Sequence, residues 1–171
     1  MKSRIEIREL GELVDAIREI PKGIVSFDGC PGAGKTTLAA KVAKVVGYSM
    51  VDLDSYIDKE RGHFVNALHR STLESKLRAE LSVSTVVVIS GVCMNAVLEC
   101  VRRKAALSIY VQKNSPIGLP SDLDFIDAET GFEPEPDTVQ YWSALDREVF
   151  SYHGEHKPRM NADIIFLRAA R

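Results

Sequence analysis

The segment FDGCPGAGKTT, residues 27–37, contains glycine, lysine and threonine residues at a characteristic spacing. The pattern GxxxxGK[ST], which holds phosphate groups, has all its fixed positions filled, by Gly29, Gly34, Lys35 and Thr36. Glycines let successive backbone N–H groups turn toward an anion, and a helix that begins near Lys35 directs its positive end at the same oxygens. The lysine neutralises the terminal phosphates. The segment therefore predicts a phosphate site.

The sequence on both sides of this segment supports the prediction. An apolar run at 23–28 precedes it, and the helical pattern 35–47 places Leu38, Val42 and Val45 on one face before it stops at Gly47. We expect the ligand to be a nucleoside triphosphate, with Mg²⁺ bound by the hydroxyl of Thr36. The residues expected to bind the nucleotide are Gly29, Cys30, Pro31, Gly32, Ala33, Gly34, Lys35, Thr36 and Thr37.

A pair of carboxylates follows the second apolar run, in the sequence MVDLDSY. In an extended segment residues i and i+2 point the same way, so Asp52 and Asp54 are expected to face the crevice beyond the strand ends. We predict Asp54 as the base that takes a proton from an attacking hydroxyl and Asp52 as the partner on the magnesium side. The two roles could be exchanged. Alternatively, both residues merely cap the following turn.

Five apolar runs are predicted as strands, and helical patterns alternate with them. The runs lie at 23–28, 48–52, 84–90, 107–111 and 162–167, and the helical patterns at 35–47, 71–81, 94–107 and 137–154. This alternation predicts an α/β fold of three layers, a parallel sheet of five strands between helices, in one domain over residues 1–171. Residues 55–70 form a polar insert and residues 114–137 form an acidic, lid-like loop.

Composition limits the other classes of function. The net charge is −2, with a pI of about 6.1, which does not favour binding to nucleic acid. The N-terminal segment has no apolar secretion signal and no stretch is long enough to span a membrane, so we expect a cytoplasmic protein. Three cysteines without CxxC spacing predict neither a disulfide framework nor a zinc site.

The phosphate-binding segment, the residues VDLDSY, the strand VVVISG and the terminal KPRMNADIIFL resemble the small P-loop metabolite kinases, especially the uridine kinase-like group. The resemblance covers roughly residues 23–111 and 156–168. It implies a nucleoside monophosphate kinase-type fold with five parallel strands, a lid, and transfer of the γ-phosphate of ATP to a small hydroxyl-bearing metabolite. By the same resemblance Asp54 is the base. From its place in DSY, Tyr56 either lines the acceptor pocket or packs in the core.

Weaker similarities point to the shikimate kinases. Arg70 and Gly91 match an arginine and a glycine that help to hold the acceptor in that family. Its glycine triplet is absent, because this chain reads SGVCM at that place. The resemblance therefore implies acceptor-binding roles for Arg70 and Gly91, without shikimate as the expected substrate.

The acidic loop departs from the pattern of these kinases. They bring arginines of the lid onto the phosphates, whereas no lysine or arginine occurs from Asn114 through Asp146. We expect Arg147 to act in their place, with Lys157 and Arg159 as the other candidates. If the acidic residues 121–137 fold over the acceptor, the acceptor is neutral or cationic. Alternatively, this loop has no ligand role.

Two functions remain open from the sequence. The first is an ATP-dependent phosphotransferase acting on a small metabolite, with Lys35, Asp54 and Arg147 as catalytic residues. The second is a P-loop NTPase or nucleotide-binding switch that acts on a protein partner. The second function would use a carboxylate at the end of the third strand to serve magnesium, but the strand VVVISG ends in Ser90 and Gly91. We expect a monomer or a homodimer.

Overall fold

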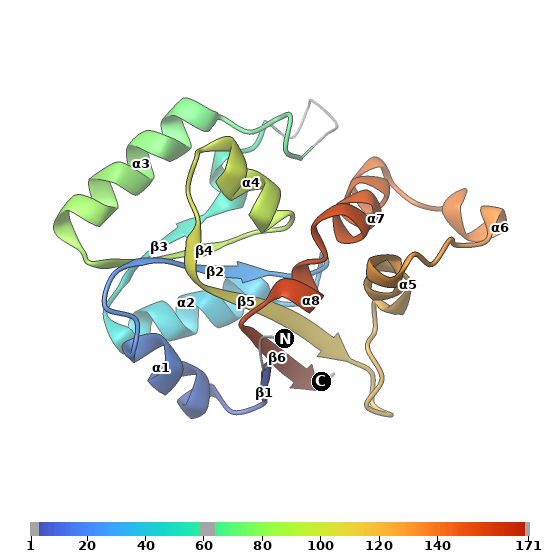
Figure 1. Ribbon diagram of the computed structural model, residues 1–171, viewed down its shortest axis with the longest axis horizontal. Helices are drawn as coiled ribbons and strands as arrows, with labels where there is room; N and C mark the ends of the chain where they lie inside the picture. The colour runs from blue at the N-terminus through green and yellow to red at the C-terminus, as the bar shows by residue number, and fades with distance from the viewer. Residues whose placement is uncertain (1–3, 59–63, 170–171) are drawn as a thin grey trace.

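The computed structural model describes residues 4–58 and 64–169, and these contain one parallel sheet of six strands. The strands lie in the order β1-β6-β5-β2-β4-β3 (Figure 1). Their bounds are β1 Ile5–Ile7, β2 Gly23–Asp28, β3 Ser49–Asp52, β4 Val86–Ser90, β5 Ala105–Asn114 and β6 Ile164–Ala169. The central strand β2 pairs with β4 on one side and β5 on the other. The chain order therefore reverses at β2, the place where α/β sheets bind ligands.

Helices cover both faces of the sheet. The longer ones are α1 Leu10–Arg18, α2 Lys35–Val46, α3 Arg70–Val83, α4 Met94–Cys100 and α7 Ala144–His156. Alternate residues of β4 enter different cores: Val86 and Val88 pack in the core with α1 and α2, and Val87 and Ile89 pack with α3 and α4. A strand buried on both faces needs apolar residues at every position. The α/β fold with three layers is thus confirmed.

The sheet has one strand more than the sequence predicted. Strand β1 pairs in parallel with β6 through three residues, with Ile7 opposite Phe166. Its alternation is hard to detect because Ile5 is exposed and the neighbouring residues are charged. The five predicted strands correspond to β2 through β6.

Several predicted helix boundaries are wrong. Helix α3 begins at Arg70 with His69 as its N-cap and no capping bond from a side chain, so the predicted start at Ser71 is one residue late. The pattern 94–107 contains the short α4, which ends where Arg102 takes a φ of 53°, and then β5. The pattern 137–154 divides into α6 Pro136–Val139 and α7, whose N-cap Ser143 forms a capping box with Asp146.

The acidic segment, defined as residues 114–137, contains local structure that its sequence did not predict. It forms α5 Leu123–Asp127, the 3₁₀ turn η3 Ala128–Thr130 and the start of α6. The ring of Phe125 stacks on Trp142, with centroids 5.3 Å apart, and packs this segment beside α7 (Figure 1). No helix in residues 4–58 or 64–169 has the length and apolar character needed to cross a membrane.

Candidate functional site

The phosphate loop, defined as residues 29–36, turns between the end of β2 and the start of α2. Three of its glycines have positive φ, 141° at Gly29, 75° at Gly32 and 85° at Gly34, which side chains disfavour. Gly29 also lies against β5, because a Cβ there would come within 2.5 Å of the Val111 carbonyl oxygen. Positive φ therefore favours glycine at all three positions, and close packing also requires it at Gly29.

Lys35 is the first residue of α2 and is only 7% exposed. Its Nζ donates a hydrogen bond to the Cys30 carbonyl oxygen at 2.7 Å, so the ammonium group lies within the turn of the phosphate loop. Burial lowers the pKa of Lys35, and the negative charge of Asp28 opposes this shift. A buried cation held beside backbone N–H groups is suited to bind anionic oxygens.

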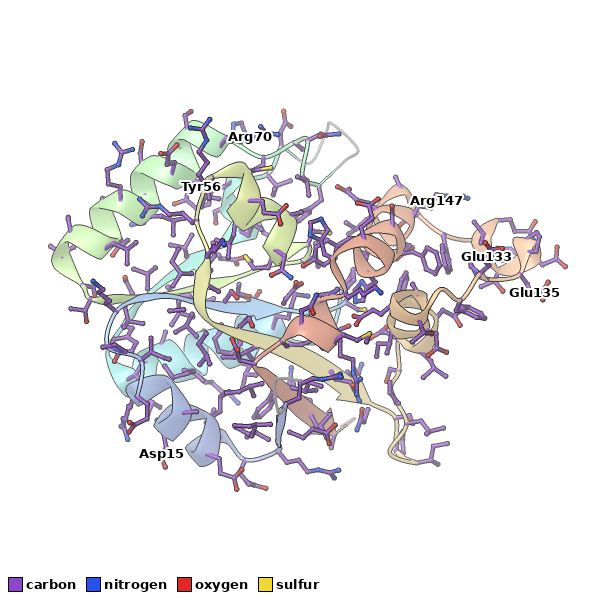
Figure 2. The ribbon with its side chains drawn as sticks, in the orientation of Figure 1. Asp15, Tyr56, Arg70, Glu133, Glu135 and Arg147 are labelled. Carbon is purple, nitrogen blue, oxygen red and sulfur yellow. The ribbon has the colours of Figure 1, made fainter. Side chains whose placement is uncertain are left out.

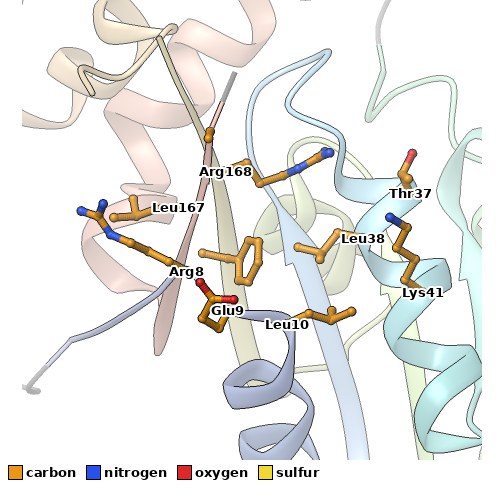
Figure 3. Close-up of a pocket in the computed structure, with 10 residues that line it drawn as sticks. Arg8, Glu9, Leu10, Thr37, Leu38, Lys41, Leu167 and Arg168 are labelled. Atoms are coloured by element: carbon orange, nitrogen blue, oxygen red, sulfur yellow. The ribbon is translucent and has the colours of Figure 1, made fainter. Parts of the chain in front are cut away.

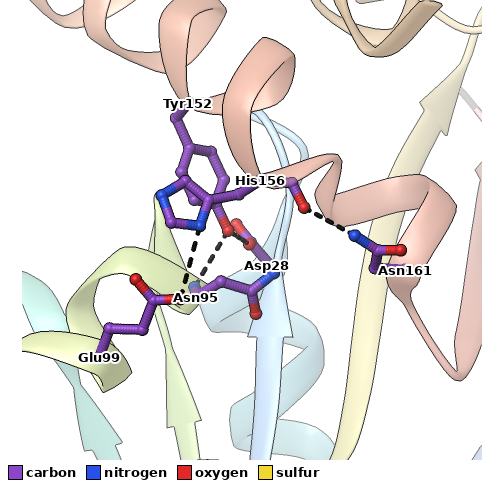
Figure 4. A network of polar contacts seen from close by, with 6 residues as sticks. All are labelled: Asp28, Asn95, Glu99, Tyr152, His156 and Asn161. Atoms are coloured by element: carbon purple, nitrogen blue, oxygen red, sulfur yellow. Dashed lines mark hydrogen bonds and ion pairs between the residues drawn. The ribbon is translucent and has the colours of Figure 1, made fainter. Parts of the chain in front are cut away.

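Asp28, which the sequence reading did not select, anchors the phosphate loop at its start. Its carboxylate accepts hydrogen bonds from the Gly29 N–H at 2.7 Å and from the hydroxyl of Tyr152 on α7. The Tyr152 oxygen in turn accepts the Asn95 N–H of α4 at 3.0 Å (Figure 4). Burial raises the pKa of Asp28. Asp28 could have been identified from the sequence, because it is an aspartate at the end of a predicted strand, immediately before the first glycine of the phosphate loop.

His153, which follows Tyr152 on α7, supports the phosphate loop at Cys30. His153 donates from Nδ1 to the Val149 carbonyl oxygen at 2.8 Å, so Nε2 accepts the hydroxyl of Tyr110, also at 2.8 Å. The sulfur of Cys30 lies 3.5 Å from that hydroxyl. Burial lowers the pKa of His153 to about 4 and raises that of Cys30 to about 12. These groups are neutral near pH 7, and we assign Cys30 a packing role.

A cavity of about 290 Å³ joins the phosphate loop to the residues after β3 and β4. Its wall includes Asp54, Gly91, Thr37 and the loop residues Pro31, Gly32, Gly34, Lys35 and Thr36. Apolar side chains complete the wall: Phe64, Val92 and Leu145. The structure therefore brings Asp54 to the phosphate loop, as predicted, and Gly91 lies in the same wall. Of the described residues in this wall, Lys35 is the one with a positive charge.

The acid pair does not have the predicted extended geometry. Strand β3 ends at Asp52, and the 3₁₀ turn η1, Leu53–Tyr56, begins at the next residue. The side chain of Asp52 accepts the Asp54 N–H at 3.2 Å and caps this turn. Asp54 lies in the cavity wall, whereas Asp52 is not among the residues that form it. The capping alternative thus describes Asp52, and its magnesium role stays a prediction.

Gly91 has a packing function beside its place in the wall. A Cβ at this residue would meet the side chain of Leu53 at 2.6 Å. The end of β4 and the turn η1 can therefore approach closely, which sets the position of Asp54 relative to the phosphate loop. The sequence resemblance implied that Gly91 helps to hold the acceptor. The structure adds its close packing against Leu53.

Three further predicted residues, which are labelled in Figure 2, are not among the residues that form the cavity wall. Tyr56 is half-buried and packs against the core beneath α3, and Arg70 is exposed at the start of that helix. Arg147 donates from Nη2 to the Val139 carbonyl oxygen at 2.8 Å. Because Leu145 faces the cavity, a residue two positions later on the helix points elsewhere. The predicted catalytic and acceptor-binding roles of these residues are not supported by their positions.

The other basic candidates also have structural partners or lie apart from the wall. Arg159 donates from Nε to the Gln112 side chain at 2.7 Å. Lys157 is the residue between α7 and α8, Pro158–Asn161, and has a left-handed φ of 47°. The insert at 55–70 lies in part outside the described residues, which include its Phe64 in the cavity wall.

Arg168, near the end of β6, is a basic residue at the phosphate loop that the sequence reading missed. Its Nη1 donates to the Ala33 carbonyl oxygen at 3.0 Å. Arg168 and Thr37 also line a second cavity of about 380 Å³, between α2, β6 and the turn before α1 (Figure 3). Thr37 belongs to the walls of both cavities, so the second begins where the first ends. No local motif around Arg168 signals this contact.

The oxygen groups at the first cavity fit a hard cation such as Mg²⁺. The Thr36 hydroxyl and the Asp54 carboxylate lie in its wall, and the Ser90 hydroxyl is 3.4 Å from that of Thr36. Within residues 4–58 and 64–169, no group of three or more His, Cys, Asp or Glu side chains could hold a metal by itself. Mg²⁺ typically keeps several waters and binds through one or two carboxylates plus substrate phosphates, which suits this sparse set.

Comparison with known proteins agrees with this geometry. Residues 31–112 match the family model for shikimate kinase. A solved structure of a "possible uridine kinase" from Bacillus stearothermophilus has a TM-score of 0.61 at 14% identity, over 92% of this chain and 96% of that one. A "putative fructose transport system kinase" from Silicibacter sp. TM1040 gives 0.55 at 15% identity, over 94% and 100%. Curated protein sequences give no match. The resemblance to P-loop small-metabolite kinases is confirmed, and the structural likenesses establish the shared fold.

Proposed function

We propose that the protein is a P-loop kinase that transfers the γ-phosphate of ATP to a hydroxyl group of a small metabolite. The observation that carries the proposal is the first cavity, whose wall contains Asp54 together with Lys35 and other residues of the phosphate loop. A phosphate site alone would serve any nucleotide-binding protein. A carboxylate in the same cavity, beside an apolar wall, adds a base and a place for an acceptor.

In this reaction the acceptor oxygen attacks the γ-phosphorus while the bond from that phosphorus to the β,γ-bridging oxygen breaks. Asp54 takes the proton of the acceptor hydroxyl, and ADP leaves. Lys35 and the N–H groups of the phosphate loop stabilise the negative charge on the phosphoryl oxygens. When bound at the Thr36 hydroxyl, Mg²⁺ would neutralise part of the phosphate charge.

The walls of the two cavities suggest how the substrates lie. The triphosphate would run from Lys35 past Thr37, and the nucleoside would occupy the second cavity. The acceptor would contact Phe64, Val92 and Leu145. Because Lys35 already serves the phosphates, no described cation in this wall is left for an acceptor carboxylate or phosphate. We therefore infer a neutral or cationic acceptor with an apolar part.

The test is ADP release from magnesium-ATP across a panel of nucleosides, sugars, amino alcohols, hydroxy acids and phosphorylated acceptors. The Lys35→Ala variant is the blank. One neutral or cationic acceptor should raise ADP release far above the blank. A preference for carboxylate or phosphorylated acceptors would contradict the acceptor class. Slow release that no acceptor changes would instead favour the NTPase or switch function.

A further inference from the structure

Arg168 contacts the phosphate loop from the second cavity. It donates to the Ala33 carbonyl oxygen, and it lines the second cavity but not the cavity that contains Lys35 and Asp54. We propose that Arg168 is a positioning residue, which orients and polarises the peptide between Ala33 and Gly34 so that its N–H binds nucleotide phosphate. This inference rests on the proposed function.

The geometry of a peptide unit carries the first step. The structure has no cis peptide bond among the described residues, so the C=O of Ala33 and the N–H of Gly34 point in opposite directions. A donor fixed on the carbonyl side therefore turns the N–H toward the other side. Gly34 lines the first cavity with Lys35, whereas Arg168 is not in that wall, so we infer that the Gly34 N–H is turned toward the phosphates.

The charge of the guanidinium carries the second step. A charged donor forms a stronger hydrogen bond than a neutral one, and hydrogen bonds in a chain polarise each other. A cation on the Ala33 oxygen withdraws electron density from the peptide, so the Gly34 N–H becomes a better donor. Arg168 thereby places positive charge behind the loop without occupying the space of the phosphates.

Gly34 is fitted to this contact. A Cβ at Gly34 would lie 1.3 Å from Nη1 of Arg168, so the guanidinium occupies the space that any side chain there would need. The positive φ of 85° independently disfavours a side chain. The same glycine thus permits both the turn of the loop and the direct approach of the arginine.

The surrounding charges explain why such a residue would be useful. The acidic segment supplies no lysine or arginine beyond Asn114, and Asp122 lies close enough to interact electrostatically with Lys35. Arg147 and Arg159 bind Val139 and Gln112 instead. Arg168 offsets this negative charge at the loop itself.

The experiment measures the binding of magnesium-ATP, ADP and adenosine by calorimetry in wild type, Arg168→Met and Arg168→Lys. The matched control is Arg78→Met, an exposed arginine paired with Glu74 on α3. Arg168→Met should weaken ATP and ADP binding about tenfold beyond any change in adenosine binding, the effect of one charge-assisted hydrogen bond. Adenosine lacks phosphate, so it reports separately any loss that comes from the altered wall of the second cavity. Arg168→Lys should restore part of the loss, since it keeps the charge but lacks the planar fork.

A second measurement follows the Gly34 amide proton by NMR in the nucleotide-free protein. Its resonance should move upfield in Arg168→Met and stay nearer the wild-type position in Arg168→Lys. Equal ATP affinity in wild type and Arg168→Met, with an unmoved Gly34 amide, would overturn the inference alone. Absence of ATP binding by wild type would overturn the proposed function, and the NMR comparison would still test Arg168. If Arg168→Met fails to fold, Arg168→Lys and Arg168→Gln replace it in both measurements.

Discussion

Two neighbouring aspartates have different environments at the residue scale. Asp52 directs its carboxylate to the backbone of the turn η1, while Asp54 lies in the wall of the cavity beside Lys35. The difference arises because the chain changes from strand to 3₁₀ turn between them, which ends the two-residue alternation of side chains. The proposed base must reach the acceptor hydroxyl, and of the two aspartates Asp54 is the one in the cavity wall.

Replacing Asp54 by Asn should therefore lower kcat by about 10²- to 10⁴-fold, the usual contribution of a general base, and leave ATP affinity nearly unchanged. The measurement is steady-state phosphotransfer together with ATP binding. The matched variant Asp52→Asn keeps an oxygen that can cap η1 and should retain most of kcat. A rise in the magnesium concentration that Asp52→Asn needs for half-maximal activity would instead support the metal role predicted from the sequence. A kcat for Asp54→Asn close to that of wild type would exclude Asp54 as the base.

The buried His153 predicts a dependence of stability on pH. Burial lowers its folded pKa to about 4 from 6.5, so the folded protein resists the proton that the unfolded chain binds. Its contribution is fully present above pH 6.5 and is lost as the pH falls through about 4, on the order of 3 kcal/mol. Urea unfolding at several pH values should show this slope.

The variant His153→Gln isolates this contribution. It removes the titrating group while an amide remains that can bind Tyr110. The free energy of unfolding should fall less steeply between pH 6.5 and 4 than in wild type, whatever its value at pH 7. Parallel pH profiles for the two proteins would show that another group controls acid unfolding. His69, which is exposed, provides the control substitution His69→Gln.

Among the elements, the acidic segment stabilises the fold through hydrogen bonds in addition to contributing negative charge. Glu129 is buried, and its carboxylate accepts the N–H groups of Arg159 and Met160, at 2.8 and 2.7 Å, in the short helix α8. Figure 2 shows Glu133 and Glu135 at the outer end of the same segment. The acidic residues therefore do not act as one group, and Glu129 joins η3 to α8.

Removing the hydrogen bonds between Glu129 and α8 should destabilise the fold. Glu129→Ala leaves two backbone N–H groups without their acceptor in a buried place, which should lower the free energy of unfolding by about 2 kcal/mol. The control Glu133→Ala removes the same charge from an exposed site and should change stability by less than about 0.5 kcal/mol. Urea denaturation of both variants provides the comparison. Equal stability of the two variants would show that Glu129 contributes nothing through its two bonds.

At the scale of the whole molecule, the strand β1 extends the sheet beyond β6, the strand that carries Arg168. Ile7 of β1 is 5% exposed and packs in the core shared by α1 and α2, whereas Ile5 on the same strand is 56% exposed. The turn after β1 supplies Arg8 and Glu9 to the second cavity. The N-terminal segment therefore supports both the sheet edge and the wall of that cavity.

Truncating Ile7 should test this support. Ile7→Ala should lower the free energy of unfolding by about 2–3 kcal/mol, because it removes buried methyl groups and leaves a cavity. Ile5→Ala on the exposed face of the same strand is the matched control and should cost less than about 0.5 kcal/mol. Thermal and urea unfolding measure both changes. A small effect at Ile7 would show that β1 adds little to the stability of the sheet.

The phosphate loop, the five central strands and the α/β class could all be predicted from the sequence alone. These features depend on local requirements: glycines that permit positive φ, a lysine at the start of a helix, and strands apolar on both faces. Asp54 was predicted because it follows a strand whose end had to lie beside the loop. The resemblance to P-loop small-metabolite kinases followed from the same residues.

Only the tertiary structure decided which side chains from distant segments meet at that loop. Asp28 and Tyr152 are 124 positions apart and Ala33 and Arg168 are 135 apart, yet each pair forms a hydrogen bond. Arg147 was predicted beside the phosphates but faces Val139, since the rotation of α7 is set by the packing of Val149 and Tyr152. Spacing along the chain fixes neighbours within a turn or a helix. Contacts between helices and strands depend on the packing of the whole core, which no single segment encodes.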